Sequence, residues 1–237
     1  MKFNKSIFAL TAAVCLTACG DGKKTSSGGG NAILEKTYHM ALANEDNYTA
    51  INAINYMLAE DSVRYGSYAD TLADLYVKVN QVNSALLVSE KILKKNASNI
   101  HALEVNAISH ERMGDMEESL ELNRKLFDMT KRMKFQYKTA AFIFAKGDLK
   151  TARVALEKVF ASKETDKDSI EIQNQEQGFA QMVPLRPAAF NLKAFIDIQE
   201  GKPADGKKAF QAALALFPEF EMAKMYLQNF DKMMQQR

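Results

Sequence analysis

Large and small apolar side chains recur at helical spacing over most of the chain. In the clearest stretch, Tyr68-Ala69-x-x-Leu72-Ala73-x-x-Tyr76, an apolar residue returns every three or four positions, and Ala85 and Ile92 continue the pattern. This spacing is typical of amphipathic α-helices. The small residues fall where two helix axes approach closely, and the larger ones fill the space between the helices. The stretch therefore predicts two antiparallel helices.

The same pattern returns along the chain at a nearly constant period. Ala85 and Ser119 occupy equivalent places in successive copies, and so do Gly114 and Gly147. One helix pair cannot bury its apolar face alone, so neighbouring pairs have to stack into a continuous core. We expect five pairs, the first of them degenerate, at about residues 31–65, 66–99, 100–132, 133–161 and 187–218.

These small and large positions resemble the tetratricopeptide repeat (TPR). The resemblance implies an all-α fold for residues 31–237: a right-handed α-solenoid of about five helix-turn-helix repeats, with a concave groove lined by the first helix of each repeat. A last helix at 219–236 has Met222 and Tyr226 on its apolar face. We expect this helix to cap the open end of the array.

One segment interrupts the period. Gly147 and Gly201 are separated by clearly more than one repeat, and the excess lies at residues 162–186. No strands are expected in the chain, so this insertion is predicted to be a loop, and loops of this length are functional or mobile. Two alternatives stay open: its apolar end docks on adjacent helices, or the loop covers the groove.

The N-terminal residues have the pattern of a processing signal. Lys2 and Lys5 precede an apolar run that is too short to span a bilayer. The run ends in Leu16-Thr17-Ala18-Cys19-Gly20, which resembles the bacterial lipobox. The resemblance implies a signal peptide at 1–18 and a diacylated Cys19, of the palmitate type, as the new N-terminus. A plain signal peptide cut near this point is the alternative.

The segment after the lipobox predicts a tether and a location. Residues 19–30 are rich in Gly, Ser and Lys, which is typical of a flexible coil. Gly20 is not the aspartate that retains enteric lipoproteins in the inner membrane, and Gly20 to Lys24 lacks an acidic string for surface display. The resemblance to lipoproteins of a Gram-negative, Bacteroidetes-like envelope thus implies the periplasmic face of the outer membrane.

The charge balance of the chain and the motifs that it lacks narrow the range of possible functions. The chain has 31 Lys+Arg and 29 Asp+Glu, and without Lys2 and Lys5 the two numbers are equal, so no basic surface for nucleic acid is expected. His39, His101 and His110 do not have the spacing of metal ligands. Motifs for a phosphate loop or an activated serine are absent from the sequence. We expect a protein without enzymatic activity, metal or cofactor.

Recognition is instead expected in the groove, where the TPR resemblance places it. Relatives that hold a C-terminal carboxylate use Lys and Asn where this chain has Asp70 and Asp74, so that specificity is not carried over. The later groove positions are apolar and aromatic, which suits an apolar helix or an extended peptide. The groove residues expected to bind a partner are Asp70, Asp74, His101, Glu104, Ile108, Arg112, Tyr137, Phe144 and Phe195.

The preferred hypothesis is a lipid-anchored scaffold that binds another protein of the cell envelope. One alternative is a soluble-ligand binder or helical enzyme with its site under the 162–186 loop. Another is a structural envelope protein that self-associates through its C-terminal helix. Asp168-Ser169-Ile170 also resembles the O-glycosylation acceptor of exported Bacteroidetes proteins, which makes Ser169 a candidate modification site in an exposed loop.

Overall fold

The structure, a computed structural model, describes residues 28–174 and 178–235 of the 237-residue chain. Within these residues eleven α-helices follow one another, and one two-stranded sheet precedes the ninth helix. The helices are α1 (Gly28–Ala43), α2 (Asn47–Glu60), α3 (Tyr68–Lys78), α4 (Val82–Lys95), α5 (Ile100–Met113), α6 (Met116–Thr130), α7 (Met133–Ala145), α8 (Leu149–Ala161), α9 (Leu185–Gln199), α10 (Pro203–Leu216) and α11 (Glu221–Gln235).

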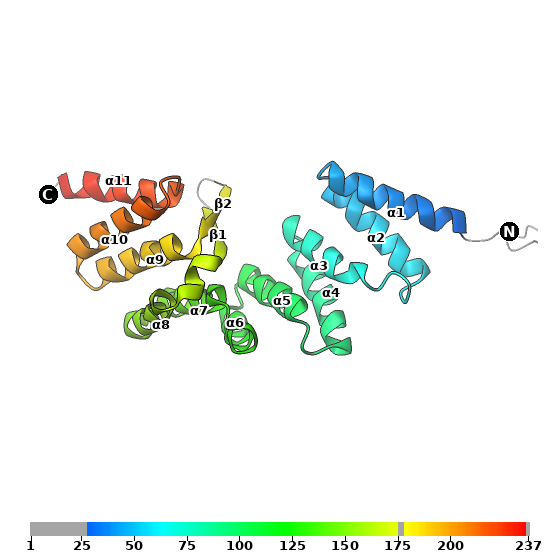
Figure 1. Cartoon of the computed structure of the whole chain (residues 1–237), viewed down its shortest axis with the longest axis horizontal. Coiled ribbons are helices and arrows are strands. Elements are labelled where there is room, and N and C mark those ends of the chain that lie inside the picture. The colour runs from blue at the N-terminus through cyan, green and yellow to red at the C-terminus, as the bar shows by residue number, and fades with distance from the viewer. Residues whose placement is uncertain (1–27, 175–177, 236–237) are drawn as a thin grey trace, which may run out of the picture.

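The helices form five consecutive pairs that stack along the long axis of the molecule (Figure 1). Within each pair the two helices pack on each other, and the second helix of one pair packs on the first helix of the next. α11 packs on α10 and ends the stack. The predicted fold, an all-α solenoid of about five helix pairs with a C-terminal capping helix, is confirmed.

Small residues lie where the helices come closest. The small residues that the pattern singled out are all at most 3% exposed: Ala73, Ala85, Ala107, Ser119, Ala140, Ala152 and Ala194. One close approach is at Gly206 in α10, where a Cβ atom would lie 2.6 Å from Ile198 Cγ1 and 2.9 Å from the carbonyl oxygen of Ala194 in α9. Glycine is the residue that permits this approach of two backbones.

Left-handed glycines end the first helix of the last three pairs. Gly114, Gly147 and Gly201 have φ angles of 83°, 85° and 76°. Glycine adopts this conformation without a steric penalty, so the chain can turn back within two or three residues. After Gly147, the carboxylate of Asp148 accepts a hydrogen bond from the backbone N–H of Thr151 at 3.0 Å and caps α8.

The 162–186 insertion is folded, and the prediction of a loop without strands is wrong. A 3₁₀ helix, η1 (Lys163–Lys167), leads into strand β1 (Ser169–Asn174), which pairs antiparallel with β2 (Phe179–Pro184). The pattern Ser-Ile-Glu-Ile-Gln of β1 alternates polar and apolar residues with the period of a half-buried strand. In a segment this short, the alternation is a weak signal compared with the helical periodicity of the surrounding sequence.

One face of this hairpin packs on the helices. Ile170 and Val183 oppose each other across the strands, are 8% and 0% exposed, and belong to the same core cluster as Tyr137 and Leu192. Met182, which also belongs to the apolar end of the insertion, lies on the opposite face of the hairpin and is 61% exposed. Figure 1 shows the hairpin projecting beside the N-terminal end of α9. The apolar end of the insertion therefore docks through its inner face alone.

The base of the hairpin is attached to the start of α7. The Asp168 carboxylate, whose side chain is 6% exposed, accepts hydrogen bonds from Arg132 Nη2 at 2.6 Å and Nε at 3.1 Å. It also accepts from the backbone N–H of Lys134 at 3.3 Å. The backbone N–H of Leu185 donates to the Asp168 carbonyl at 2.9 Å, which closes the hairpin below its first strand pair.

The two ends of the array shift slightly from the predicted boundaries. α1 begins at Gly28, inside the predicted tether 19–30, and α11 occupies Glu221–Gln235 of the predicted 219–236. The predicted signal peptide and Cys19 lie outside the described residues. Among the described helices, none is long and apolar enough to cross a membrane.

Candidate functional site

The first helices of successive pairs, α3, α5, α7 and α9, carry the residues expected to line the groove. α3 packs directly on α5, and α7 packs directly on α9. Asp74 of α3 and His101 of α5 meet across the first of these contacts, with Oδ1 and Nε2 3.2 Å apart. The close carboxylate of Asp74, together with nearby Asp70, raises the pKa of His101 to about 9 despite its partial burial. His101 is therefore a cation at neutral pH.

Ion pairs also connect α5 to α7. Lys134 Nζ of α7 contacts Glu104 Oε1 of α5, and Lys138 Nζ lies 2.7 Å from Glu111 Oε2. All four side chains are at most 35% exposed, so these pairs are partly screened from solvent. They fix the positions of charged side chains on two neighbouring helices. The charged part of the predicted groove is thus organised before any ligand binds.

Arg112 at the end of α5 joins three parts of the fold. Its Nη1 donates a hydrogen bond of 2.6 Å to the Val77 carbonyl at the end of α3. Its Nη2 lies 3.9 Å from Glu171 Oε1 in β1. Glu171 opposes Met182 on the outer face of the hairpin. The outer face of the hairpin therefore lies beside α5, which the sequence did not predict.

The expected aromatic cluster is only partly accessible. The Tyr137 ring is buried in the core cluster that contains Ile170 and Val183, which corrects the expectation that it faces the groove. Burial raises the pKa of the Tyr137 hydroxyl, so it stays protonated at any physiological pH. Phe144 and Phe195 are partly buried and lie 6.4 Å apart between ring centroids.

The capping helix covers Phe195. The ring of Tyr226 in α11 packs edge-on against Phe195 at 4.7 Å, and Phe210 of α10 packs on it at 5.4 Å. Ile108 of α5 is partly exposed and lies in the charged part of the groove. The groove was expected to change from acidic to aromatic positions along its length. In the structure its charged half is accessible, and its aromatic half is largely covered.

The expected acceptor serine lies in a strand and not in a loop. Ser169 is exposed and is the first residue of β1, but its neighbours Asp168 and Ile170 are both buried. Asp168 is also held by Arg132. Glycosylation of Ser169 stays a prediction, now for a serine between two buried side chains.

Asp70 of α3 lies near His101, whose pKa it helps to raise, and it also borders a cavity. This cavity lies between α2, α3 and α4, and the Oδ1 atom of Asp70 is buried without a hydrogen-bond partner among the described residues. In the part of the chain that the structure describes, no group of three or more His, Cys, Asp or Glu side chains could hold a metal ion. His110, for example, contacts a single carboxylate, Asp115, at 3.0 Å.

Solved structures resemble this arrangement of helix pairs. A tetratricopeptide repeat protein from Parabacteroides merdae aligns over 86% of this chain and 73% of its own with 19% identity and a TM-score of 0.56. A thermophilic TPR protein of Thermus thermophilus aligns over 84% and 98% with 13% identity and a TM-score of 0.56. A double mutant of MamA from RS-1 aligns over 82% and 98% with 10% identity and a TM-score of 0.62. The chain has the tetratricopeptide-repeat fold. No family model and no curated protein sequence matches it.

The identities to these TPR structures are low, so the likeness establishes the fold and nothing about a ligand. Within the TPR array, the hairpin between the fourth and fifth repeats brings Glu171 to 3.9 Å from Arg112 of α5. Glu171 and its cross-strand neighbour Met182 were missed as candidate site residues. The alternation of β1 was the signal that could have found them, because it separates Glu171 from the buried Ile170 and the half-buried Ile172.

Proposed function

We propose that this TPR protein is a non-catalytic scaffold that binds a partner protein between α3, α5 and the outer face of the hairpin. The observation that carries the proposal is the position of Glu171, 3.9 Å from Arg112 of α5, with Met182 as its cross-strand neighbour on the same face of the hairpin. A groove with one helical wall and one strand wall can hold an extended segment or a helix on two sides. Met182 supplies an exposed apolar contact beside charged groups.

The chemistry of this surface favours recognition over catalysis. The groove carboxylates Asp74, Glu104, Glu111 and Glu171 each lie within 4.0 Å of a cationic side chain. Each of these carboxylates is thus already engaged by a cationic side chain of the protein itself. Paired charges at fixed positions instead provide specificity for a partner of complementary charge.

The covered aromatic half changes the expected ligand. With Tyr137 buried and Phe195 under Tyr226, a purely apolar helix would find few anchors. An amphipathic segment fits better, because its apolar side chains can contact Ile108 and Met182 while its charged ones meet Arg112 and Glu171. The aromatic half serves to hold the last repeat and the capping helix together.

We also propose that a lipid on Cys19 anchors the scaffold to the envelope, at the periplasmic face of the outer membrane. The support is the lipobox pattern and the Gly- and Ser-rich segment before α1. Several acyl chains on one cysteine hold a protein firmly to a bilayer, whereas a single chain does so only marginally. Replacement Cys19→Ala tests this: the protein should leave the membrane fraction and lose the mass of the lipid. Retention of Cys19→Ala in the membrane fraction would contradict the anchor.

A photocrosslinking experiment tests the groove. A photoreactive phenylalanine replaces Met182 on the outer face of the hairpin, and in a matched control it replaces Val154 on α8, which is 52% exposed. Met182 should capture a partner protein in cells, Val154 should not, and Arg112→Ala should reduce the capture at Met182. Equal capture at both positions, or capture that does not depend on Arg112, would refute a groove site.

A further inference from the structure

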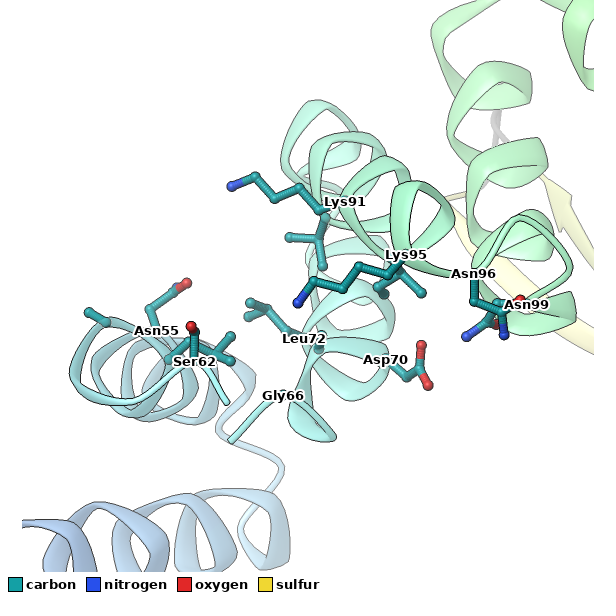
Figure 2. A pocket seen from close by; sticks show the side chains of 14 residues that line it. Asn55, Ser62, Gly66, Asp70, Leu72, Lys91, Lys95, Asn96 and Asn99 are labelled. Carbon is teal, nitrogen blue, oxygen red and sulfur yellow. The ribbon is translucent and has the colours of Figure 1, made fainter. Parts of the chain in front are cut away.

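A cavity of about 490 Å³ lies between the second helices of the first two repeats, α2 and α4, and above the start of α3 (Figure 2). This volume is in the range of small-ligand sites. Its apolar lining comes from Leu58, Leu72, Val88 and Ile92. None of the hairpin residues lines the cavity, and the cavity adjoins the groove between α3 and α5 only at Asp70 and Asn99.

The polar lining consists mainly of hydrogen-bond donors. Lys91 and Lys95 lie one turn apart on α4, and neither ammonium forms an ion pair within the described residues. Figure 2 shows the Lys95 side chain extending from α4 over Leu72 toward the end of α2. Two unpaired cations beside an apolar lining favour a ligand that carries a negative charge on an apolar group.

Two asparagines add donors to the same side of the cavity. Asn96 Oδ1 already accepts from the backbone N–H of Ser98 at 3.1 Å, and Asn99 Oδ1 accepts from that of Ala102 at 2.9 Å. Their oxygens are thus engaged in local caps, while their NH₂ groups are left to donate. Both side chains line the cavity near Asp70 (Figure 2).

Asp70 supplies a hydrogen-bond acceptor to complement these donors. Its Oδ1 atom is buried and accepts no hydrogen bond from the described residues. An unpaired buried acceptor is costly, so a ligand with an N–H group beside its anion would be stabilised there. An amide N–H, an apolar side chain and a carboxylate occur together in one kind of group: an N-acylated apolar amino acid with a free α-carboxylate.

We propose that this cavity binds such a group, with its carboxylate at Lys91 and Lys95, its side chain against Leu72 and Ile92, and its amide N–H at Asp70. The group can come from the last residue of a polypeptide or from a free N-acyl amino acid. The position between α2 and α4 sets this site apart from the TPR groove, where the partner is proposed to bind. The experiment on the cavity and the experiment on the groove can therefore succeed or fail separately.

Methyl NMR of the full chain tests the proposal, with the methyl groups of Val88 and Ile92 as reporters. The probes are N-acetyl-leucine and an N-acetylated tetrapeptide ending in leucine, each as the free acid and as the C-terminal amide. The free acids should shift both reporters in a saturable way up to about 20 mM, and the amides should not. Tighter binding of the tetrapeptide than of N-acetyl-leucine would identify a polypeptide end as the source, and equal binding would identify the free amino acid.

Lysine variants on α4 provide the matched control. Lys95→Gln should weaken binding of the free acid by about tenfold, the loss expected for one charge-assisted hydrogen bond. Lys94→Gln removes an exposed charge from the same helix outside the cavity and should leave the affinity unchanged. Equal shifts with acid and amide, equal losses in the two variants, or no saturable shift would each overturn the proposal.

Discussion

Asp166 and Asp168 lie two residues apart, and each pairs with an arginine, yet only Asp168 should hold the hairpin. Asp166 Oδ1 lies 2.5 Å from Arg186 Nε with its side chain 59% exposed. Asp168 Oδ1 lies 2.6 Å from Arg132 Nη2 with its side chain 6% exposed, and its other oxygen accepts from the Lys134 backbone. The two replacements Asp166→Asn and Asp168→Asn therefore remove the same charge from different environments.

The expected magnitudes follow from this difference in burial. An exposed ion pair contributes about 0–1 kcal/mol, so Asp166→Asn should have little effect. Loss of the Asp168 charge leaves three partly buried hydrogen bonds with a weaker acceptor and should cost about 1–3 kcal/mol. The cost stays below that of a fully buried pair, because the Arg132 side chain is 51% exposed and keeps water contacts.

Hydrogen exchange of the backbone amides is the appropriate assay, because a repeat array opens in parts. With a loss of about 2 kcal/mol, the amides of β1 and β2 should exchange about thirtyfold faster in Asp168→Asn. Amides of α1 to α4 should keep their rates, and Asp166→Asn should resemble the unmodified protein. Equal acceleration in the two variants, or acceleration spread over all helices, would show that Asp168 does not hold the hairpin.

Three further predictions concern other contacts. The His101–Asp74 pair should add about 0.5–1 kcal/mol to the free energy of unfolding below pH 6.5, because the folded state raises the pKa of His101 to about 9. This contribution should be lost as the pH rises from 6.5 to 9. Denaturation measured across this pH range checks the prediction, and His101→Gln should show no such pH dependence. Gly206→Ala should destabilise the protein by about 1–3 kcal/mol in urea unfolding, because the new Cβ meets the Ala194 carbonyl. Arg112→Ala should lower thermal stability only slightly and weaken partner capture strongly, whereas unchanged capture would refute its role.

The sequence allowed the helical array to be predicted because its signal is redundant. Every repeat shows the same small residues at the same spacing, so one atypical position does not hide the period. Gly206 is such a case: it opens α10 where other repeats have Ala or Ser, and the approach of Ile198 and Ala194 explains the glycine. Gly114 and Gly147, which the period places at equivalent positions, both adopt the left-handed conformation.

The hairpin and the cavity could not be predicted in this way, because they depend on contacts between distant segments. Asp168 lies a full repeat beyond Arg132 in the sequence, and the polar string around it is typical of an exposed loop until that partner is known. Tyr137 occupies a groove position by alignment, but it belongs to a core cluster that also contains hairpin residues, and these follow only after the whole of α8. A period fixes which helix face a residue lies on, and an insertion decides whether that face is accessible.

The contacts of the hairpin differ in strength from base to outer face, and this difference bears on how a partner could bind. At the base, the Asp168 carboxylate accepts three hydrogen bonds, whereas on the outer face Glu171 lies 3.9 Å from Arg112, beyond hydrogen-bond distance. Arg112 Nη1 already donates to the Val77 carbonyl, and Glu171 Oε1 already accepts from Gln173 Nε2. A ligand that bonds to Arg112 Nη2 or to the other Glu171 oxygen would thus replace only the weak contact between the two side chains. The Arg112–Glu171 contact is therefore a point at which a partner can bind without breaking a hydrogen bond of the fold.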